Sequence, residues 1–165
     1  MVTKTTLSAI RALMYISCHE DEGPLSPRKI GQELNESPTY MAKVTRHLVK
    51  AGLLRAEKGV KGGVRLNRRP AQITLLEVVQ ACQGTIVGYY CQRDCDLSLT
   101  CSYHRAAAEL HDAISGVLSR WTLAQLLKKP ASSLKIGGAM TCVMLNGISA
   151  AVFLPGGAQA AAPKG

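Results

Sequence analysis

The sequence predicts a mainly α-helical fold with a small β-hairpin: a winged helix-turn-helix followed by a long dimerisation helix. Three observations predict this fold class. Apolar residues recur at helical spacing through much of residues 4–50. Two short strand-like segments then flank a turn rich in lysine and glycine at residues 58–63, and a heptad of apolar residues follows at 107–121. The 165-residue chain is long enough to bury a core of its own.

The first fifty residues contain three predicted helices. The first spans about residues 4–18, where apolar residues repeat every three or four positions. The second, over 27–34, begins after Ser26 with a proline, and the third, over 38–50, begins with the same signal after Ser37. Serine caps a helix, and proline suits the first helical position. The turn of three or four residues between the second and third helices predicts a helix-turn-helix.

The segment after the third helix predicts a wing that carries positive charge. Residues 53–57 and 64–66 are the expected strands. Between positions 37 and 70 there are nine Lys or Arg residues and one acid, Glu57, a bias that favours contacts with DNA phosphates. Residues 1–70 hold 13 basic and 6 acidic residues (+7), whereas residues 71–165 hold 7 and 5 (+2). We therefore expect double-stranded DNA to bind the first half.

The predicted DNA-binding residues belong to the helix-turn-helix and to the wing. In the third helix we expect contacts with bases or nearby phosphates, although Tyr40 has the alternative of packing inward. In the wing we expect contacts with the backbone or the minor groove. The complete set is Arg28, Ser37, Thr39, Tyr40, Lys43, Arg46, Lys58, Lys61 and Arg65.

After residue 70 the pattern predicts a short helix over 75–82 capped by Thr74, and a long helix that is capped by Ser102 and reaches about residue 120. The heptad in the long helix is suited to pairing with a second copy, the alternative being a helix packed only within its own domain. A capping box at Thr122 starts a last helix to about residue 128. The heptad positions are Ala107, Leu110, Ile114, Val117 and Trp121.

Three cysteines and a histidine lie within fourteen residues, at Cys91, Cys95, Cys101 and His104. Thiolates and imidazole are the ligands of tetrahedral zinc and of iron–sulfur clusters. The other cysteines are interpreted as small buried hydrophobic residues. The start of the chain lacks a signal-peptide pattern, so we expect a cytoplasmic protein with reduced thiols and no membrane partner.

The predicted organisation has four parts. Residues 1–82 form the winged helix-turn-helix and residues 83–101 the cluster-binding loop. Residues 102–129 form the dimerisation helix with the short C-terminal helix, and residues 130–165 form a flexible tail. Within that tail the uncharged segment 136–154 is diluted by glycine and polar residues, so membrane insertion is the less favoured interpretation.

These motifs together resemble a known family of regulators. The motifs are Ile10-Arg11-Ala12-Leu13-Met14-Tyr15, the helix-turn-helix, the wing Lys61-Gly62-Gly63-Val64-Arg65-Leu66, Pro70-Ala71-Gln72-Ile73-Thr74-Leu75, the three-cysteine loop and Trp121-Thr122-Leu123-Ala124. Over residues 3–129 the chain resembles the IscR-type winged-helix regulators, which include NsrR and RirA. The resemblance implies a cytoplasmic bacterial homodimer that binds a palindromic operator and carries an iron–sulfur cluster in each subunit.

By this resemblance Cys91, Cys95 and Cys101 match the three cluster cysteines, with a first gap of three residues where relatives usually have five or more. His104 matches the histidine that is the fourth ligand in IscR-like members; water, a small molecule or another side chain are the alternatives. NsrR-like members use a carboxylate on the first helix of the partner subunit, but this chain has no Asp or Glu before Glu20. A 2Fe–2S cluster is favoured over 4Fe–4S.

Two other uses of the cysteine cluster stay open. One is a DNA-binding protein with a purely structural zinc on the same four ligands. The other is a metal-free thiol switch, in which two of the three clustered cysteines form a reversible disulfide. An enzyme is not expected, because the sequence has no nucleophile–base pair, paired carboxylates or phosphate-binding glycine loop. The signal (iron, redox state or nitric oxide) is left open as well.

Overall fold

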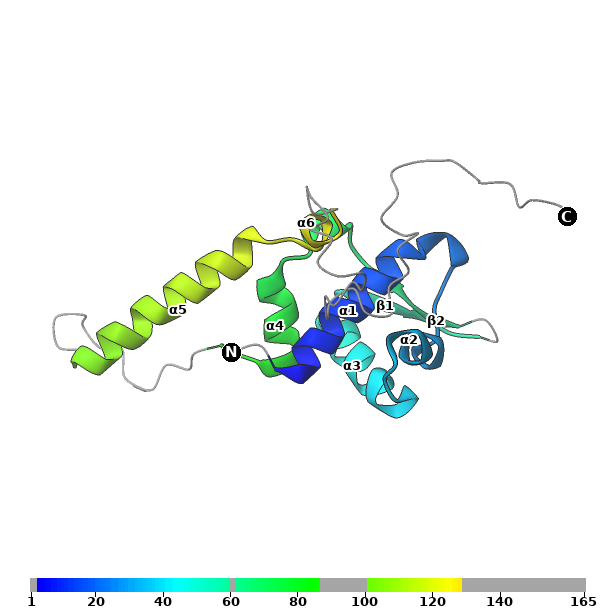
Figure 1. The fold of residues 1–165 in the computed structure, drawn as a ribbon, viewed down its shortest axis with the longest axis horizontal. Helices are drawn as coiled ribbons and strands as arrows, with labels where there is room; N and C mark the ends of the chain where they lie inside the picture. The colour runs from blue at the N-terminus through cyan, green and yellow to red at the C-terminus, as the bar shows by residue number, and fades with distance from the viewer. Residues whose placement is uncertain (1–2, 60–61, 87–100, 129–165) are drawn as a thin grey trace, which may run out of the picture.

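The computed structural model describes residues 3–59, 62–86 and 101–128 of the chain (Figure 1). Within them it is mainly helical with one two-stranded antiparallel sheet, as the sequence predicted. The elements in order are α1 (Lys4–Cys18), the 3₁₀ turn η1 (Glu20–Glu22), α2 (Pro27–Leu34), α3 (Pro38–Lys50), β1 (Leu54–Glu57), β2 (Gly63–Leu66), the 3₁₀ turn η2 (Pro70–Gln72), α4 (Leu75–Gln83), α5 (Ser102–Arg120) and α6 (Leu123–Leu126).

The predicted helix starts in the helix-turn-helix are confirmed by their caps. The Ser26 hydroxyl accepts a hydrogen bond from the backbone N–H of Lys29, and that of Ser37 accepts one from Tyr40, both at 3.2 Å. Between α2 and α3, Asn35 adopts the left-handed conformation with φ 57°, which a short polar side chain tolerates.

Two predicted boundaries in the second half are wrong. Ser102 is not the cap of the long helix: it is the first residue of α5, and Cys101 occupies the cap position without a side-chain hydrogen bond. The last helix ends at Leu126, two residues earlier than expected. Its capping box is confirmed, since the Gln125 side chain accepts a hydrogen bond from the Thr122 backbone N–H at 2.7 Å.

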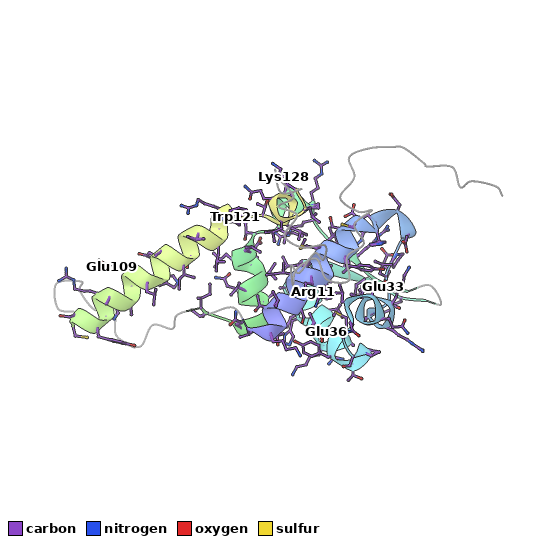
Figure 2. The ribbon with its side chains drawn as sticks, viewed as in Figure 1. Arg11, Glu33, Glu36, Glu109, Trp121 and Lys128 are labelled. Atoms are coloured by element: carbon purple, nitrogen blue, oxygen red, sulfur yellow. The ribbon has the colours of Figure 1, made fainter. Side chains whose placement is uncertain are left out.

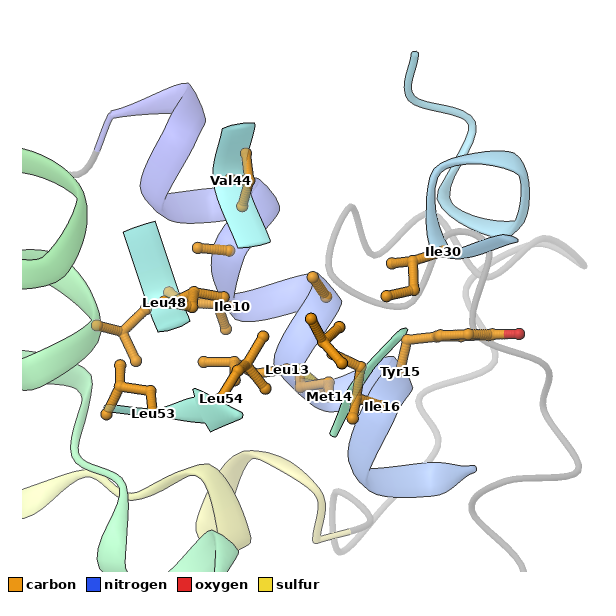
Figure 3. Close-up of a cluster of buried hydrophobic side chains, with 14 of the residues drawn as sticks. Ile10, Leu13, Met14, Tyr15, Ile16, Ile30, Val44, Leu48, Leu53 and Leu54 are labelled. Carbon is orange, nitrogen blue, oxygen red and sulfur yellow. The ribbon is translucent and has the colours of Figure 1, made fainter. Parts of the chain in front are cut away.

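The core forms around α1, which is the most completely buried helix of the described residues (Figure 3). Helix α1 contacts α2, α3, α4, α6 and β2. Burying a large aliphatic side chain stabilises a fold by about 1.5–3 kcal/mol, so this shared core fixes α3, the expected recognition helix, in place. Its larger members include Ile10, Leu13, Met14, Ile16, Ile30, Leu34, Met41, Val44, Leu48, Leu53 and Leu54.

The wing is anchored on both of its sides. Strands β1 and β2 pair from Leu54↔Leu66 to Glu57↔Gly63. The other edge of β2 exchanges two hydrogen bonds between Leu25 and Val64, at 3.0 and 2.9 Å. The wing is therefore attached to the segment that precedes α2.

Helix α5 extends away from this body (Figure 1), and its C-terminal end is tied to the start of α4. The Leu75 N–H donates to the Trp121 carbonyl at 2.9 Å, and the Leu123 N–H donates to the Ile73 carbonyl at 2.8 Å. Among the described helices, none combines the length and the apolar character that a membrane crossing requires.

Candidate nucleic-acid interface

Helix α3 has a buried side and an exposed side that differ sharply in chemistry. Met41, Val44 and Leu48 are fully buried, and Thr45 beside them satisfies its hydroxyl on the Met41 carbonyl at 3.0 Å. The opposite side is exposed along the whole helix and contains no acid. We call it the α3 basic stripe, and it consists of Thr39, Ala42, Lys43, Arg46 and Lys50.

Two predicted DNA-binding residues of α3 have structural partners in the protein. The Ser37 hydroxyl is occupied by the cap of α3. Tyr40 is half-buried; its hydroxyl donates to Thr5 Oγ1 at 3.4 Å, and the Lys4 ammonium lies 5.9 Å from the centre of its ring. The side chain of Tyr40 thus connects the recognition helix to the first turn of α1.

In the wing, Lys58 is exposed, whereas Arg65 is held by the protein. One Arg65 nitrogen lies 3.6 Å from Glu57 Oε1, and another donates to the Glu20 carbonyl at 3.5 Å. Arg55 also approaches Glu57, at 3.5 Å. Lys61 lies outside the described residues. Lys58 is therefore the predicted wing contact that the described structure leaves in solvent.

On α2, the predicted residue Arg28 is exposed beside a lysine with a partner. Lys29 forms an ion pair with Glu22. The hydrogen bond between them raises the pKa of the lysine and lowers that of the glutamate. Arg28 is not part of this ion pair, so Glu22 does not compensate its charge.

Two exposed lysines near this surface were not among the predicted contacts. Lys50 continues the α3 basic stripe, and its spacing of four and seven from Arg46 and Lys43 is a helical signal that was available in the sequence. Lys4 comes beside α3 because α1 packs on it (Figure 1). Lys4 and Tyr40 are 36 positions apart in the sequence, so no local sequence pattern could have predicted their contact.

Two of the four predicted metal ligands fall on described residues. Cys101 is exposed at the cap position of α5, and His104 is half-buried in its first turn. A spacing of three places both on one side of the helix. Cys91 and Cys95 lie outside the described residues, and within the described ranges there is no group of three or more potential ligands. The thiol and imidazole that are present have the chemistry an iron–sulfur cluster or zinc requires.

The described cysteines outside the cluster differ from Cys101. Cys18 and Cys82 are half-buried, and burial raises the pKa of both thiols. A hydrogen bond with Thr6 partly offsets this effect at Cys82. A thiol that is harder to ionise is a poorer ligand and nucleophile. This agrees with their interpretation as packing residues.

Comparison with known proteins identifies a family. The protein-family model described as "Rrf2: Iron-dependent Transcriptional regulator" matches residues 2–129 of this chain. The chain is 29% identical to the HTH-type transcriptional regulator NsrR of Geobacillus kaustophilus, covering 79% of this chain and 92% of that protein. It is 28% identical to the regulator IscR of Photobacterium profundum, covering 73% and 71%.

The fold is also similar to solved structures. CymR (YrzC), described as the global cysteine regulator of B. subtilis, is 25% identical and has a TM-score of 0.60, covering 76% of this chain and 95% of CymR. The resemblance to IscR-type regulators is thus confirmed, and the winged-helix class with it. Since the relatives are transcriptional regulators, the prediction that the chain is not an enzyme is confirmed as well.

Proposed function

Because this chain belongs to the Rrf2 family of DNA-binding transcriptional regulators, we propose that it binds a palindromic operator as a homodimer under the control of an iron–sulfur cluster. The observation that carries the proposal is the position of Cys101 and His104. Both lie at one end of α5, and the other end of this helix is hydrogen-bonded to the start of α4.

Operator binding begins with the α3 basic stripe. A helix-turn-helix places the N-terminal part of its second helix in the major groove, where Thr39 and Lys43 face solvent. Arg46 and Lys50 further along suit the phosphates beside the groove. Lys58 in the wing and Arg28 on α2 extend the positive surface to either side.

The second copy is expected to cover the apolar side of α5. Tyr103, Leu110, Val117 and Trp121 are exposed large hydrophobic residues, with 66%, 55%, 46% and 47% of their surfaces accessible. They recur at spacings of seven, seven and four, which forms one apolar stripe along the helix. A dimer of this kind would present two α3 helices to successive major grooves about 34 Å apart.

The path from the predicted ligands to DNA runs through α5 and α4. A change at the first turn of α5 is transmitted along a helix of 19 residues to the bridge between Thr74 and Thr122. Helix α4 begins at this bridge and packs against both α1 and α3. The spacing of the two recognition helices would therefore depend on how the start of α5 is held.

Cys101 and His104, together with Cys91 and Cys95, would hold the cluster. A bound cluster would join these four residues through iron–ligand bonds. A change in iron supply, an oxidant or nitric oxide can alter those bonds. A coupling of about 1–3 kcal/mol, as is usual in allostery, would change operator affinity roughly five- to hundredfold. Support comes from the donor chemistry of the two described residues and from the iron-dependent description of the family.

The test is anaerobic purification of the full chain, followed by an absorption spectrum and by iron and sulfide analysis. We expect a coloured protein with iron and sulfide in matched amounts and with cluster-dependent binding to a duplex selected from random sequence. The ratio of iron to subunit distinguishes 2Fe–2S from 4Fe–4S. Cys101→Ser should lose iron, whereas the control Cys18→Ala, which removes a half-buried thiol, should keep it.

Other outcomes would replace the cluster and leave DNA binding intact. One zinc per subunit in a colourless protein would indicate a structural metal. DNA binding that follows reductant without iron would indicate a thiol switch. The exposed thiol of Cys101 and the similarity to CymR, the cysteine regulator, favour that second candidate over zinc. Failure of the wild-type protein to select any duplex would contradict the operator proposal itself.

A further inference from the structure

Lys4 is an exposed cation that lies at the start of the recognition helix although it belongs to α1. It is the first residue of α1, and Figure 1 shows this end of α1 beside α3. The Lys4 ammonium lies 5.9 Å from the centre of the Tyr40 ring, within the range of a cation–π interaction. Because Tyr40 stands in the first turn of α3, this contact places the ammonium next to the part of α3 that enters the groove.

The Tyr40 side chain is held in this orientation from both ends. Its Cα belongs to α3, and its hydroxyl donates to Thr5 Oγ1 in the first turn of α1. A ring attached at both ends is a fixed platform for Lys4, and it is not free to turn toward a base. Tyr40 is therefore better explained as a positioning residue than as a reader of sequence.

The charge of Lys4 is available to a ligand. Among the ion pairs of the described residues none involves Lys4, in contrast to Lys29 on α2, which is paired with Glu22. The surface it joins contains Lys43, Arg46 and Lys50. A DNA backbone following the groove around α3 passes both sides of that helix, since the two strands border the groove.

We propose that Lys4 binds a phosphate of the operator backbone beside the first turn of α3, and that Tyr40 holds its ammonium there. This inference rests on the proposed DNA binding and adds a contact from α1. The rival explanation is that Lys4 and Tyr40 only fasten α1 to α3. The two explanations differ in their dependence on salt, because only a phosphate contact releases counterions.

The experiment measures the affinity of the full-length protein for a duplex selected from random sequence by the wild type, over a series of salt concentrations. Lys4→Gln should weaken binding roughly tenfold for the dimer. It should also reduce the slope of log affinity against log salt by about 0.9 per subunit, hence about 1.8 per dimer. Lys4→Arg should restore both, because it keeps the charge and the stacking on the ring.

Two further comparisons make the result specific. Lys128→Gln removes an exposed lysine two residues after the end of α6, well away from α3 (Figure 2), and should leave the slope unchanged. Tyr40→Leu removes the ring that holds the Lys4 ammonium. The loss of affinity caused by Lys4→Gln should therefore be roughly two- to fivefold smaller in the Tyr40→Leu protein than in the wild type.

The outcomes separate this inference from the proposed function. If Lys43→Ala lowers the salt slope and Lys4→Gln does not, the protein binds DNA but the Lys4 contact is refuted. A loss of thermal stability in Lys4→Gln with an unchanged slope would likewise favour the fastening role. If the wild type selects no duplex, both the proposed function and this inference are overturned.

Discussion

Glu77 is the residue at which the segment after the wing joins α4. Its Oε2 accepts hydrogen bonds from the backbone N–H and the hydroxyl of Thr74, at 2.9 and 3.0 Å. Its Oε1 accepts one from Arg68 at 2.7 Å, and Arg68 also donates to the Gln72 carbonyl at 3.4 Å. One carboxylate thus caps α4 and orients the chain that links the wing to it.

These contacts make the stability of the protein depend on pH in a defined direction. Burial raises the pKa of Glu77, but the hydrogen bonds from Thr74 and Arg68 outweigh it and lower the pKa below the ordinary 4.5. A carboxyl whose folded pKa is lower than its unfolded pKa stabilises the fold above the unfolded value. The contribution is lost as the pH falls below 4.5 and through the folded pKa.

We predict that Glu77→Gln lowers the free energy of unfolding by about 1 kcal/mol at neutral pH, the usual effect of losing a capping interaction, with little added by the partly exposed ion pair. The difference from wild type should shrink as the pH falls below 4.5. Urea unfolding at fixed protein concentration measures both. Asp21→Asn, which removes an exposed carboxylate in η1, is the control. A difference that stayed constant with pH would contradict the role of Glu77.

At the scale of single residues, local signals predicted caps but not distant partners. Ser26 and Ser37 act as caps because a hydroxyl needs only the first turn of its own helix. Ser102 was the expected cap of α5 because serine is a favoured cap residue, but Cys101 occupies that position without a side-chain hydrogen bond. The contact of Lys4 with Tyr40 depends on how α1 packs on α3, which no local pattern contains.

Among the elements, the wing depends on a glycine at the point where β2 has a neighbour on each side. A Cβ built on Gly63 would lie 2.5 Å from the backbone carbon and oxygen of Leu25. These atoms cannot move without breaking the bonds between Leu25 and Val64. The absence of a side chain is what lets β2 approach so closely.

We predict that Gly63→Ala costs about 2–3 kcal/mol of stability, as overpacking does, and also weakens DNA binding because the wing shifts. Thermal unfolding and binding to the selected duplex are the two measurements. Gly52→Ala is the comparison, since Gly52 has φ +71° with open space around it. That variant should lose about 1–2 kcal/mol through backbone strain while the wing stays in place. Equal DNA affinity of wild type and Gly63→Ala would contradict the steric argument.

The elements themselves were predictable because each has a characteristic spacing of apolar residues and recognisable start and stop residues. The boundaries of α1, α2 and α3 follow from helical spacing and from the Ser-Pro starts. The pairing of Leu25 with β2 was not expected, since one residue gives no strand pattern. The bridge between Thr74 and Thr122 joins positions 48 apart, and only the folded chain brings them together.

At the scale of the whole molecule, α5 is the element on which large apolar side chains remain exposed among the described residues. These side chains lie along one side of the helix, and the most extensive contact of α5 with another described element is with α4. Composition contributes to this: with 4% aromatic residues, the chain has few large groups to cover such a helix by itself. The predicted heptad contained Leu110, Val117 and Trp121 but not Tyr103. Which copy or partner covers these residues lies beyond the pattern of one sequence.

The proposed dimer makes a sharp prediction about charge on the two sides of α5. Leu110→Glu places a carboxylate in the middle of the apolar stripe, where pairing would bury it without a partner. We expect the dissociation constant of the dimer to rise roughly hundredfold, an effect of about 3 kcal/mol. Sedimentation velocity over a range of concentrations measures the change.

Ser119→Glu is the matched control, because Ser119 is exposed and lies nine residues, or about two and a half turns, from Leu110 on the other side of the helix. It adds the same charge and should leave the dimer intact. On a duplex with two half-sites Leu110→Glu should bind more weakly than Ser119→Glu, whereas on a single half-site the two should bind alike, since each recognition helix then acts alone. If Leu110→Glu stayed dimeric, the apolar stripe of α5 would not be the interface, and another surface would have to set the spacing of the two α3 helices.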